Sequence, residues 1–102
     1  MADIISIKDL KKEKDYLIVD VRTSAELESD PIQSAPENYL HMELQTIPTR
    51  HKELPKDKRL AFLCAGNIRS VQAAEYLEGL GYENICVLDK FSLQILPSKF
   101  FA

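Results

Sequence analysis

A buried strand, a cysteine loop and a helix are expected to follow one another in residues 60–82, which read LAFLCAGNIRSVQAAEYLEGLGY. The run LAFL (60–63) does not alternate with polar residues, which is typical of a strand buried on both faces of a parallel sheet. Cys64 follows at the carboxyl end of that strand, and four residues separate it from Arg69. This stretch therefore predicts a thiol at the edge of a sheet, facing the start of a helix.

The helix of this unit is expected over residues 69–81 and is the strongest in the chain. Its predicted apolar stripe consists of Val71, Ala74, Leu77 and Leu80. Gly81 suits the left-handed residue that ends many helices.

The rest of the chain repeats the alternation of strands and helices. Buried strands are expected at YLIVDV (16–21) and ICVL (85–88), with weaker strands near residue 4 and at YLHMEL (39–44). Short helices are expected at SIKDLKKEK (6–14), with Ser6 as its cap, at TSAELES (23–29), and at IPTRHKEL (47–54). This order indicates an α/β fold with a mainly parallel central sheet flanked by helices, and we interpret residues 1–102 as a single domain.

Composition narrows the classes of function. Sixteen acidic residues against thirteen basic ones give a net charge of −3, which argues against nucleic-acid binding. No apolar run approaches the roughly 18 residues of a membrane helix, and the N-terminus lacks a secretory pattern. We therefore expect a cytoplasmic protein without membrane contact. The two cysteines and two histidines have no zinc-type spacing, so neither a metal nor a cofactor is expected.

The loop after Cys64 has the features of an anion cradle around a reactive thiol. The N-terminus of the following helix offers unpaired N–H groups and a partial positive charge. Gly66 and Asn67 tolerate the left-handed geometry that a tight loop needs. A thiol placed there is expected to be largely ionised at neutral pH. A buried cysteine before an ordinary strand–helix turn is the alternative, and the coincidence of these features disfavours it.

The pair of segments LIVDVRTSAEL (17–27) and LAFLCAGNIRSVQAAEYLEGLGYENICVL (60–88) resembles the rhodanese (sulfurtransferase) homology domain. The shared landmarks are Asp-Val-Arg after a strand, six residues from Cys to Arg, a helix, then Gly-Tyr and a strand. The resemblance implies a rhodanese-like fold and a Cys64 that takes a sulfane sulfur from a donor and passes it to a thiophilic acceptor. It also implies that loop N–H groups hold the persulfide; the loop residues are Ala65, Gly66, Asn67, Ile68, Arg69 and Ser70.

Charged residues around the loop are assigned mostly structural roles. Arg69 could orient an anionic donor or brace the loop, and we prefer bracing because one arginine at a helix start is often structural. Asp20 and Arg22 are expected to give structural support, Asp20 by capping the next turn and Arg22 by pairing with Glu26.

Three other candidates for catalysis are set aside. His41 and His51 are expected to lie outside the chemistry, because a thiolate nucleophile needs no general base. Cys86 is expected to be inaccessible inside a strand and not to resolve a persulfide on Cys64.

Departures from the family pattern affect the substrate. Ala65 stands where thiosulfate-using members often carry a basic residue, and Asn67 replaces the glycine usual three residues after the cysteine. Asp30-Pro31-Ile32 replaces a Gly-His-Ile segment. We therefore expect weak thiosulfate turnover.

Two other functions stay open beside sulfur transfer. One is a cysteine phosphatase or arsenate-reductase-like enzyme, although the phosphatase loop has one more residue between Cys and Arg. The other is a non-catalytic rhodanese-like module that binds a protein. The expected partners are a small sulfur donor and acceptor or a sulfur-relay protein, and the chain is expected to be a monomer.

Overall fold

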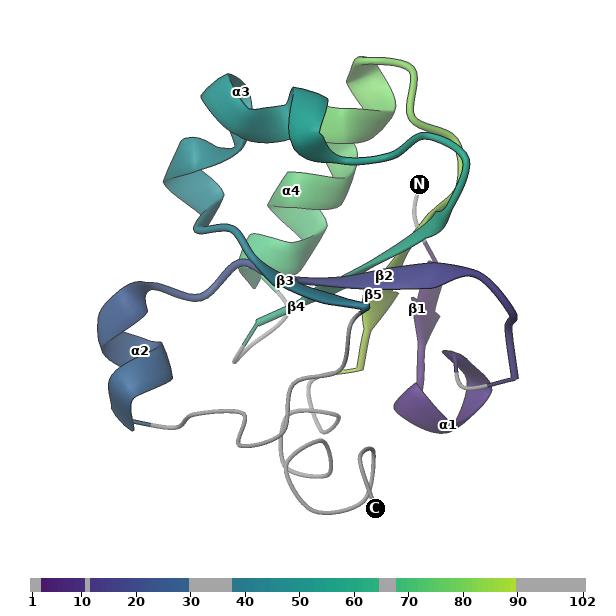
Figure 1. The fold of residues 1–102 in the computed structure, drawn as a ribbon, viewed down its shortest axis with the longest axis horizontal. Coiled ribbons are helices and arrows are strands. Elements are labelled where there is room, and N and C mark those ends of the chain that lie inside the picture. Colours follow the sequence, from purple (N-terminus) through teal and green to yellow (C-terminus); the bar gives the residue numbers. More distant parts are fainter. Residues whose placement is uncertain (1–2, 11, 30–37, 65–67, 90–102) are drawn as a thin grey trace.

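A parallel sheet forms the centre of the molecule in the computed structural model, which describes residues 3–10, 12–29, 38–64 and 68–89 (Figure 1). The five strands lie in the order β1-β5-β4-β2-β3, and every neighbouring pair is parallel. They are β1 (Asp3–Ile5), β2 (Tyr16–Asp20), β3 (Tyr39–His41), β4 (Arg59–Leu63) and β5 (Ile85–Leu88). The expected α/β fold with a parallel sheet is confirmed.

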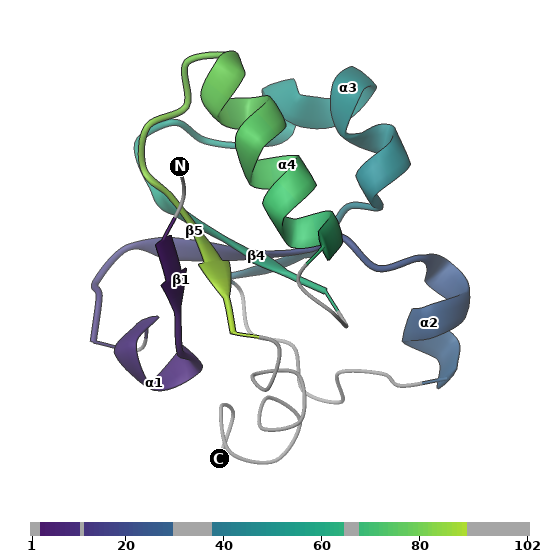
Figure 2. The same cartoon turned by 180° about the vertical axis from the view of Figure 1, so that it is seen from behind.

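Helices lie on both sides of this sheet (Figures 1 and 2). They are α1 (Ile7–Leu10), α2 (Ser24–Ser29), α3 (Ile47–Arg50) and α4 (Ile68–Gly79), with 3₁₀ turns η1 (Leu44–Thr46) and η2 (His51–Glu53) before and after α3. Helices α3 and α4 cover one face, whereas α1 and α2 lie on the opposite side. None of the helices in the described ranges is long and apolar enough to cross a bilayer.

Strand β4 occupies the middle of the sheet and is buried on both faces, as its uninterrupted apolar run predicts. Leu60 and Phe62 point into the core beneath α4, together with Cys64 just beyond the strand. Ala61 and Leu63 point to the other side, into a second cluster that includes Leu10 and Cys86. The two cysteines therefore belong to different cores, separated by the sheet.

Helix α4 buries only part of the predicted stripe, namely Ala74 and Leu77. The buried positions are Ser70, Ala73, Ala74 and Leu77, whereas Val71 is half-buried and Leu80 is exposed. The helix ends at Gly79, and Gly81 adopts a φ of 97°, so Leu80 lies past the last helical turn. The expected left-handed glycine is confirmed. The apolar pattern predicted a buried Leu80 because it extended the helix beyond Gly79.

Two other predicted helices are shorter or broken. The first ends at Leu10 instead of continuing to residue 14, although Ser6 caps it by accepting the Asp9 N–H at 3.1 Å. Leu10 is fully buried and residues 12–15 are exposed, so a further turn would have no packing partner among the described residues. The segment expected at 47–54 divides into α3 and η2.

Candidate active site

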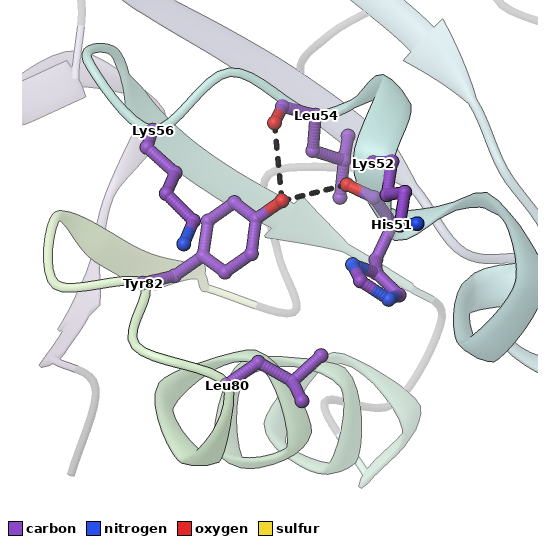
Figure 3. A pocket seen from close by; sticks show the side chains of 6 residues that line it. All are labelled: His51, Lys52, Leu54, Lys56, Leu80 and Tyr82. Carbon is purple, nitrogen blue, oxygen red and sulfur yellow. Dashed lines mark hydrogen bonds between the residues drawn. The ribbon is translucent and has the colours of Figure 1, made fainter.

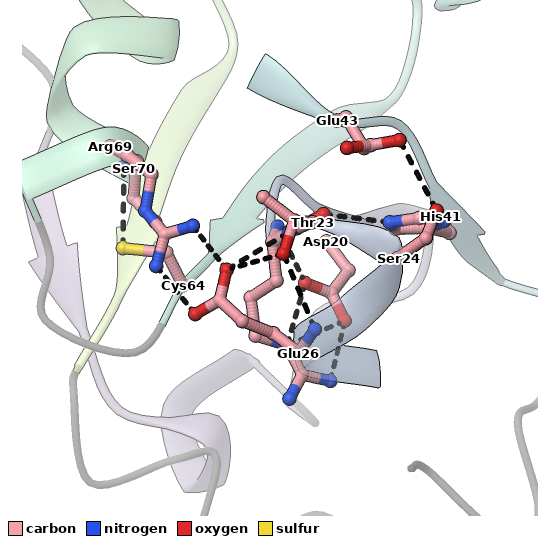
Figure 4. Close-up of polar contacts among 10 residues, drawn as sticks. Asp20, Thr23, Ser24, Glu26, His41, Glu43, Cys64, Arg69 and Ser70 are labelled. Atoms are coloured by element: carbon pink, nitrogen blue, oxygen red, sulfur yellow. Dashed lines mark hydrogen bonds and ion pairs between the residues drawn. The ribbon is translucent and has the colours of Figure 1, made fainter. Parts of the chain in front are cut away.

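Cys64 lies directly after β4, where the first turn of α4 faces the edge of the sheet. Its side chain is 1% exposed, and the main-chain N–H of Ser70 points at Sγ with an N–S distance of 3.4 Å (Figure 4). The predicted meeting of a thiol and a helix N-terminus is therefore present. Ile68, Arg69 and Ser70 of the predicted loop form this first turn. The predicted loop residues Ala65, Gly66 and Asn67 lie outside the described residues.

Arg69 is held by Glu26 of helix α2. Its two terminal nitrogens face the two carboxylate oxygens of Glu26, and Nη2 lies 2.8 Å from Oε2 (Figure 4). Hydrogen bonds from Arg69, and next from the Thr23 main chain, lower the pKa of Glu26 to about 2. The same hydrogen bond raises the pKa of Arg69, to which the nearby Cys64 also contributes. This two-pronged contact favours the bracing role for Arg69.

Glu26 also closes the start of its own helix. Its main-chain N–H donates to Thr23 Oγ1 at 3.2 Å, and its Oε1 accepts the Thr23 N–H at 3.0 Å. This reciprocal pair is a capping box, which the Thr-x-x-Glu spacing could have revealed. The bond to Arg69 could not be read in the same way, because 43 positions separate the two residues. Glu26 thus ties the start of α2 to the start of α4.

Arg22 pairs with Asp20, and the predicted pair of Arg22 with Glu26 is wrong. Arg22 Nη2 lies 2.8 Å from Asp20 Oδ2, and Asp20 Oδ1 accepts the Arg22 main-chain N–H at 3.1 Å. Tyr39 donates its hydroxyl hydrogen to Asp20 Oδ2 at 2.6 Å. The predicted pairing failed because Asp20, two residues away and also buried, offers Arg22 a fully desolvated partner, while Glu26 turns toward Arg69.

Electrostatics support a structural role for this buried group. Burial acts to lower the pKa of Arg22, but the hydrogen bonds and charge of Asp20 outweigh it and raise that pKa. Burial, followed by the bond to Asp20, raises the pKa of Tyr39. The cluster therefore fixes the end of β2 with a charged arginine and a neutral tyrosine. As predicted, Asp20 caps the turn that follows β2.

The two histidines take separate positions. His41 Nε2 lies 2.7 Å from the carbonyl oxygen of Arg22, so the ring supports the same strand end as Asp20. His51 belongs to η2, and its carbonyl oxygen accepts a hydrogen bond from the Tyr82 hydroxyl at 2.7 Å. Within the described ranges, neither ring forms a hydrogen bond with Cys64.

The family match spans most of this architecture. A profile of the Rhodanese-like domain family matches residues 5–92, from β1 past β5. The chain belongs to the rhodanese-like domain family. It is 38% identical over 72 residues to a sulfurtransferase of Allochromatium vinosum, a match that covers 71% of this chain and 64% of the relative.

Solved structures agree with the assignment to the rhodanese-like domain family. A rhodanese-related protein from Thermoplasma volcanium superimposes with a TM-score of 0.70 at 32% identity, over 85% of this chain and 83% of that one. A rhodanese-like domain protein from Staphylococcus aureus gives a TM-score of 0.69 at 29% identity, over 87% of each chain. The fold is thus shared over nearly the full length of two small proteins.

Sequence reasoning missed a small cavity that Arg69 of this rhodanese-like domain helps to line. It has a volume of about 180 Å³ and is lined by Val21, Thr23, Glu43, Leu44, Gln45 and Arg69. Glu43 brings a carboxylate to it and accepts a hydrogen bond from Ser24 Oγ at 3.2 Å. A cavity of this size suits one side chain or a few solvent molecules. Its residues come from the segment after β2, from η1 and the residue before it, and from α4, so no single motif predicts it.

Ser70 contributes a second feature that the sequence did not predict. Its side chain is fully buried, and its Oγ has no hydrogen-bond partner among the described residues. A buried hydroxyl without a partner is uncommon, because it loses its bonds to water without replacing them. The main-chain N–H of the same residue meanwhile points at Cys64.

Proposed function

We propose that this chain is a sulfurtransferase that carries sulfur as a persulfide on Cys64. The observation that carries the proposal is the contact between the Ser70 N–H and Cys64 Sγ at the first turn of α4, in a chain of the rhodanese-like domain family. A helix N-terminus stabilises negative charge, and both a thiolate and a persulfide anion carry it. The sulfurtransferase name of the Allochromatium vinosum relative supports the same reaction class.

The reaction divides into two displacements at sulfur. In the first, the Cys64 thiolate attacks the outer sulfur of a donor persulfide; the bond from Sγ to that sulfur forms, the donor S–S bond breaks, and the donor leaves as a thiolate. In the second, an acceptor thiolate attacks the same sulfur, and Cys64 leaves as a thiolate. The sulfur atom moves with its oxidation level unchanged, so no external oxidant or reductant is needed.

The charges near Cys64 bear on the choice of donor. Arg69 is bound by Glu26, and the cavity that Arg69 helps to line also carries the carboxylate of Glu43. A thiosulfate dianion at Arg69 would therefore meet an arginine whose charge is already balanced by Glu26, and the carboxylate of Glu43 would repel it. A persulfide on a small thiol or on a sulfur-relay protein carries less charge, and we propose this class as the donor. The proposed acceptor is likewise a small thiol or a thiol of a sulfur-relay protein.

Two other functions remain in competition. A phosphatase-like or arsenate-reductase-like activity is disfavoured by the family, and the six-residue span from Cys64 to Arg69 leaves less room for three phosphoryl oxygens. A non-catalytic binding module is disfavoured by the intact Cys64 and its N–H contact. The chain spans 64% of the length of the Allochromatium vinosum relative.

Intact-mass spectrometry tests the proposal directly. The protein is incubated with thiosulfate and, separately, with a cysteine desulfurase and cysteine. We expect the mass to rise by one sulfur atom, faster from the desulfurase than from thiosulfate, and the added sulfur to be lost when a thiol is supplied. Cys64→Ser should take up no sulfur, whereas Cys86→Ser should load like the natural protein. No adduct from either donor in a folded protein would overturn the proposal and favour a binding module.

A further inference from the structure

A second cavity lies at the opposite end of α4 from Cys64. Its volume is about 410 Å³, and it is lined by His51, Lys52, Leu54, Lys56, Leu80 and Tyr82 (Figure 3). These residues come from η2, from the segment before β4 and from the chain that follows α4. We propose that this cavity is the docking site for an acidic peptide segment of a partner protein, one that inserts an apolar side chain and places carboxylates beside the two lysines.

The charge of the cavity is the first argument. Lys52 and Lys56 are two of its six lining residues, and none of the six is acidic, although the chain has a net charge of −3. Among the described residues, no carboxylate forms an ion pair with either lysine. Glu53, the next residue after Lys52, pairs instead with Arg50, whose Nε and Nη2 each lie 3.0 Å from a carboxylate oxygen of Glu53. The local positive charge is thus available to an anionic ligand.

The walls of the cavity are fixed by internal contacts. The Tyr82 hydroxyl donates to the His51 carbonyl oxygen at 2.7 Å, which joins η2 to the chain after α4 (Figure 3). The Lys56 ammonium lies 5.0 Å from the centre of the Tyr82 ring, within range of a cation–π contact. Leu54 and Tyr82 are buried and supply an apolar floor. A preformed cavity with an apolar floor and a cationic rim is suited to an amphipathic ligand.

An apolar ridge extends the site beyond the cavity. Leu80 is 41% exposed at its lip, and Tyr76, which precedes it by four positions, is 42% exposed. Tyr76 lies in the last turn of α4 and Leu80 directly follows the helix, so both expose apolar surface at this end of α4. A small anion would fill the cavity without covering this ridge. A peptide with apolar side chains at successive turns would cover both, and this extent favours the peptide.

The docking site lies far from the proposed sulfur carrier. Helix α4 has 12 residues, so its two ends lie about 18 Å apart. Cys64 faces the first turn, whereas Leu80 lies past the last one. A partner held by its acidic segment could therefore remain bound while a thiol approaches Cys64. Binding at this site does not depend on sulfur chemistry, so the two proposals can fail separately.

NMR titration of the ¹⁵N-labelled chain of residues 1–102 tests the docking site. The probe is an N-acetylated, C-amidated peptide of sequence EELFEELE, compared with QQLFQQLQ, which lacks the charges, and EESSEESE, which lacks the apolar groups. We expect the first peptide to shift the amide signals of Lys52, Lys56, Leu80 and Tyr82 with a Kd below about 1 mM, and the other two to bind at least about 5-fold more weakly.

Matched charge variants separate this site from general attraction. Lys52→Gln combined with Lys56→Gln should weaken binding of the first peptide by about 5-fold, because two partly exposed charge contacts are lost. Lys8→Gln combined with Lys14→Gln makes the same change in net charge elsewhere and should leave the Kd unaltered. Equal weakening in both double variants would overturn the proposal. So would saturation of the same amides by sodium benzoate at the peptide's affinity, which would identify a site for small carboxylates.

Discussion

Ser70 shows at the scale of a single residue how this site differs from an ordinary core position. Its hydroxyl is buried without a hydrogen-bond partner among the described residues, so the folded state carries an unmet desolvation cost. Ser70→Ala removes that hydroxyl and keeps the main-chain N–H that faces Cys64. We expect the free energy of unfolding to rise by up to about 1 kcal/mol, measured by urea denaturation at neutral pH.

Thr23→Ala is the matched comparison, because it removes a hydroxyl that is bonded. Thr23 Oγ1 accepts the Glu26 N–H at 3.2 Å as the cap of α2. Its loss should lower the free energy of unfolding by about 1 kcal/mol, the opposite sign to Ser70→Ala. A clear loss of stability in Ser70→Ala would show that the Ser70 hydroxyl is satisfied in solution.

At the scale of elements, Glu26 connects two helices through its charge. Its pKa of about 2 in the folded chain is below the value of about 4.3 expected when unfolded. The ion pair with Arg69 therefore stabilises the fold fully above about pH 4.3, and this contribution is lost as the pH falls toward 2. Glu26→Gln should lower stability at pH 7 by about 1 kcal/mol or less, since the two side chains are 34% and 30% exposed.

Urea denaturation between pH 7 and pH 3 measures this difference. The gap between the natural protein and Glu26→Gln should narrow as the pH falls. Glu28→Gln changes an exposed carboxylate of the same helix and should show no comparable gap. A gap that stays constant across the range would mean that Glu26 acts through packing and not through its charge.

The two glycines at the end of α4 are expected to respond in opposite ways to substitution by alanine. Gly81 has a φ of 97°, which side chains rarely adopt, whereas Gly79 is helical, and a Cβ at either position would meet nothing within 4 Å. Gly81→Ala should therefore cost about 1 kcal/mol of stability through backbone strain. Gly79→Ala should gain about 0.5–1 kcal/mol because alanine loses less backbone entropy in a helix. Equal effects in denaturant melts would contradict the left-handed end.

The sequence predicted the elements better than their faces. The runs at 16–21, 60–63 and 85–88 are strands because continuous apolar residues suit a sheet covered on both sides. The predicted stripe of α4 was correct at Ala74 and Leu77, but it missed the buried Ser70 and Ala73, because the apolar pattern does not mark a serine or a second alanine as buried. The first helix was too long because capping and propensity set its start, while packing of Leu10 sets its end.

At the scale of the whole molecule, the sequence located the thiol but not the contacts that surround it. The strand–Cys–helix order was enough to place Cys64 against the first turn of α4. The contact between Arg69 and Glu26 joins two distant segments, and local spacing carries no information about it. The cavity lined by Lys52 and Lys56 is also built from segments that are distant in sequence. The two lysines precede β4, whereas Leu80 and Tyr82 follow it.

The sheet itself separates the two cysteines, and this leads to a redox prediction. In the sheet, Cys86 of β5 pairs with Ala61 of β4. Cys64 lies three residues beyond Ala61, which is about 10 Å along the strand direction, and neighbouring strands are about 4.8 Å apart. The Cα atoms of the two cysteines are therefore about 11 Å apart. A disulfide requires less than about 7 Å, and the two side chains also enter different cores.

Burial also raises the pKa of Cys86 to about 11, so its thiol is inert at neutral pH. We expect diamide treatment followed by intact-mass spectrometry to show no Cys64–Cys86 bond, and iodoacetamide to label Cys64 alone in the folded protein. Cys64→Ser should resist labelling until urea unfolds it, when Cys86 becomes reactive. An intramolecular disulfide formed under native conditions would mean that β5 leaves the sheet, and Cys86 would then be able to resolve a Cys64 persulfide.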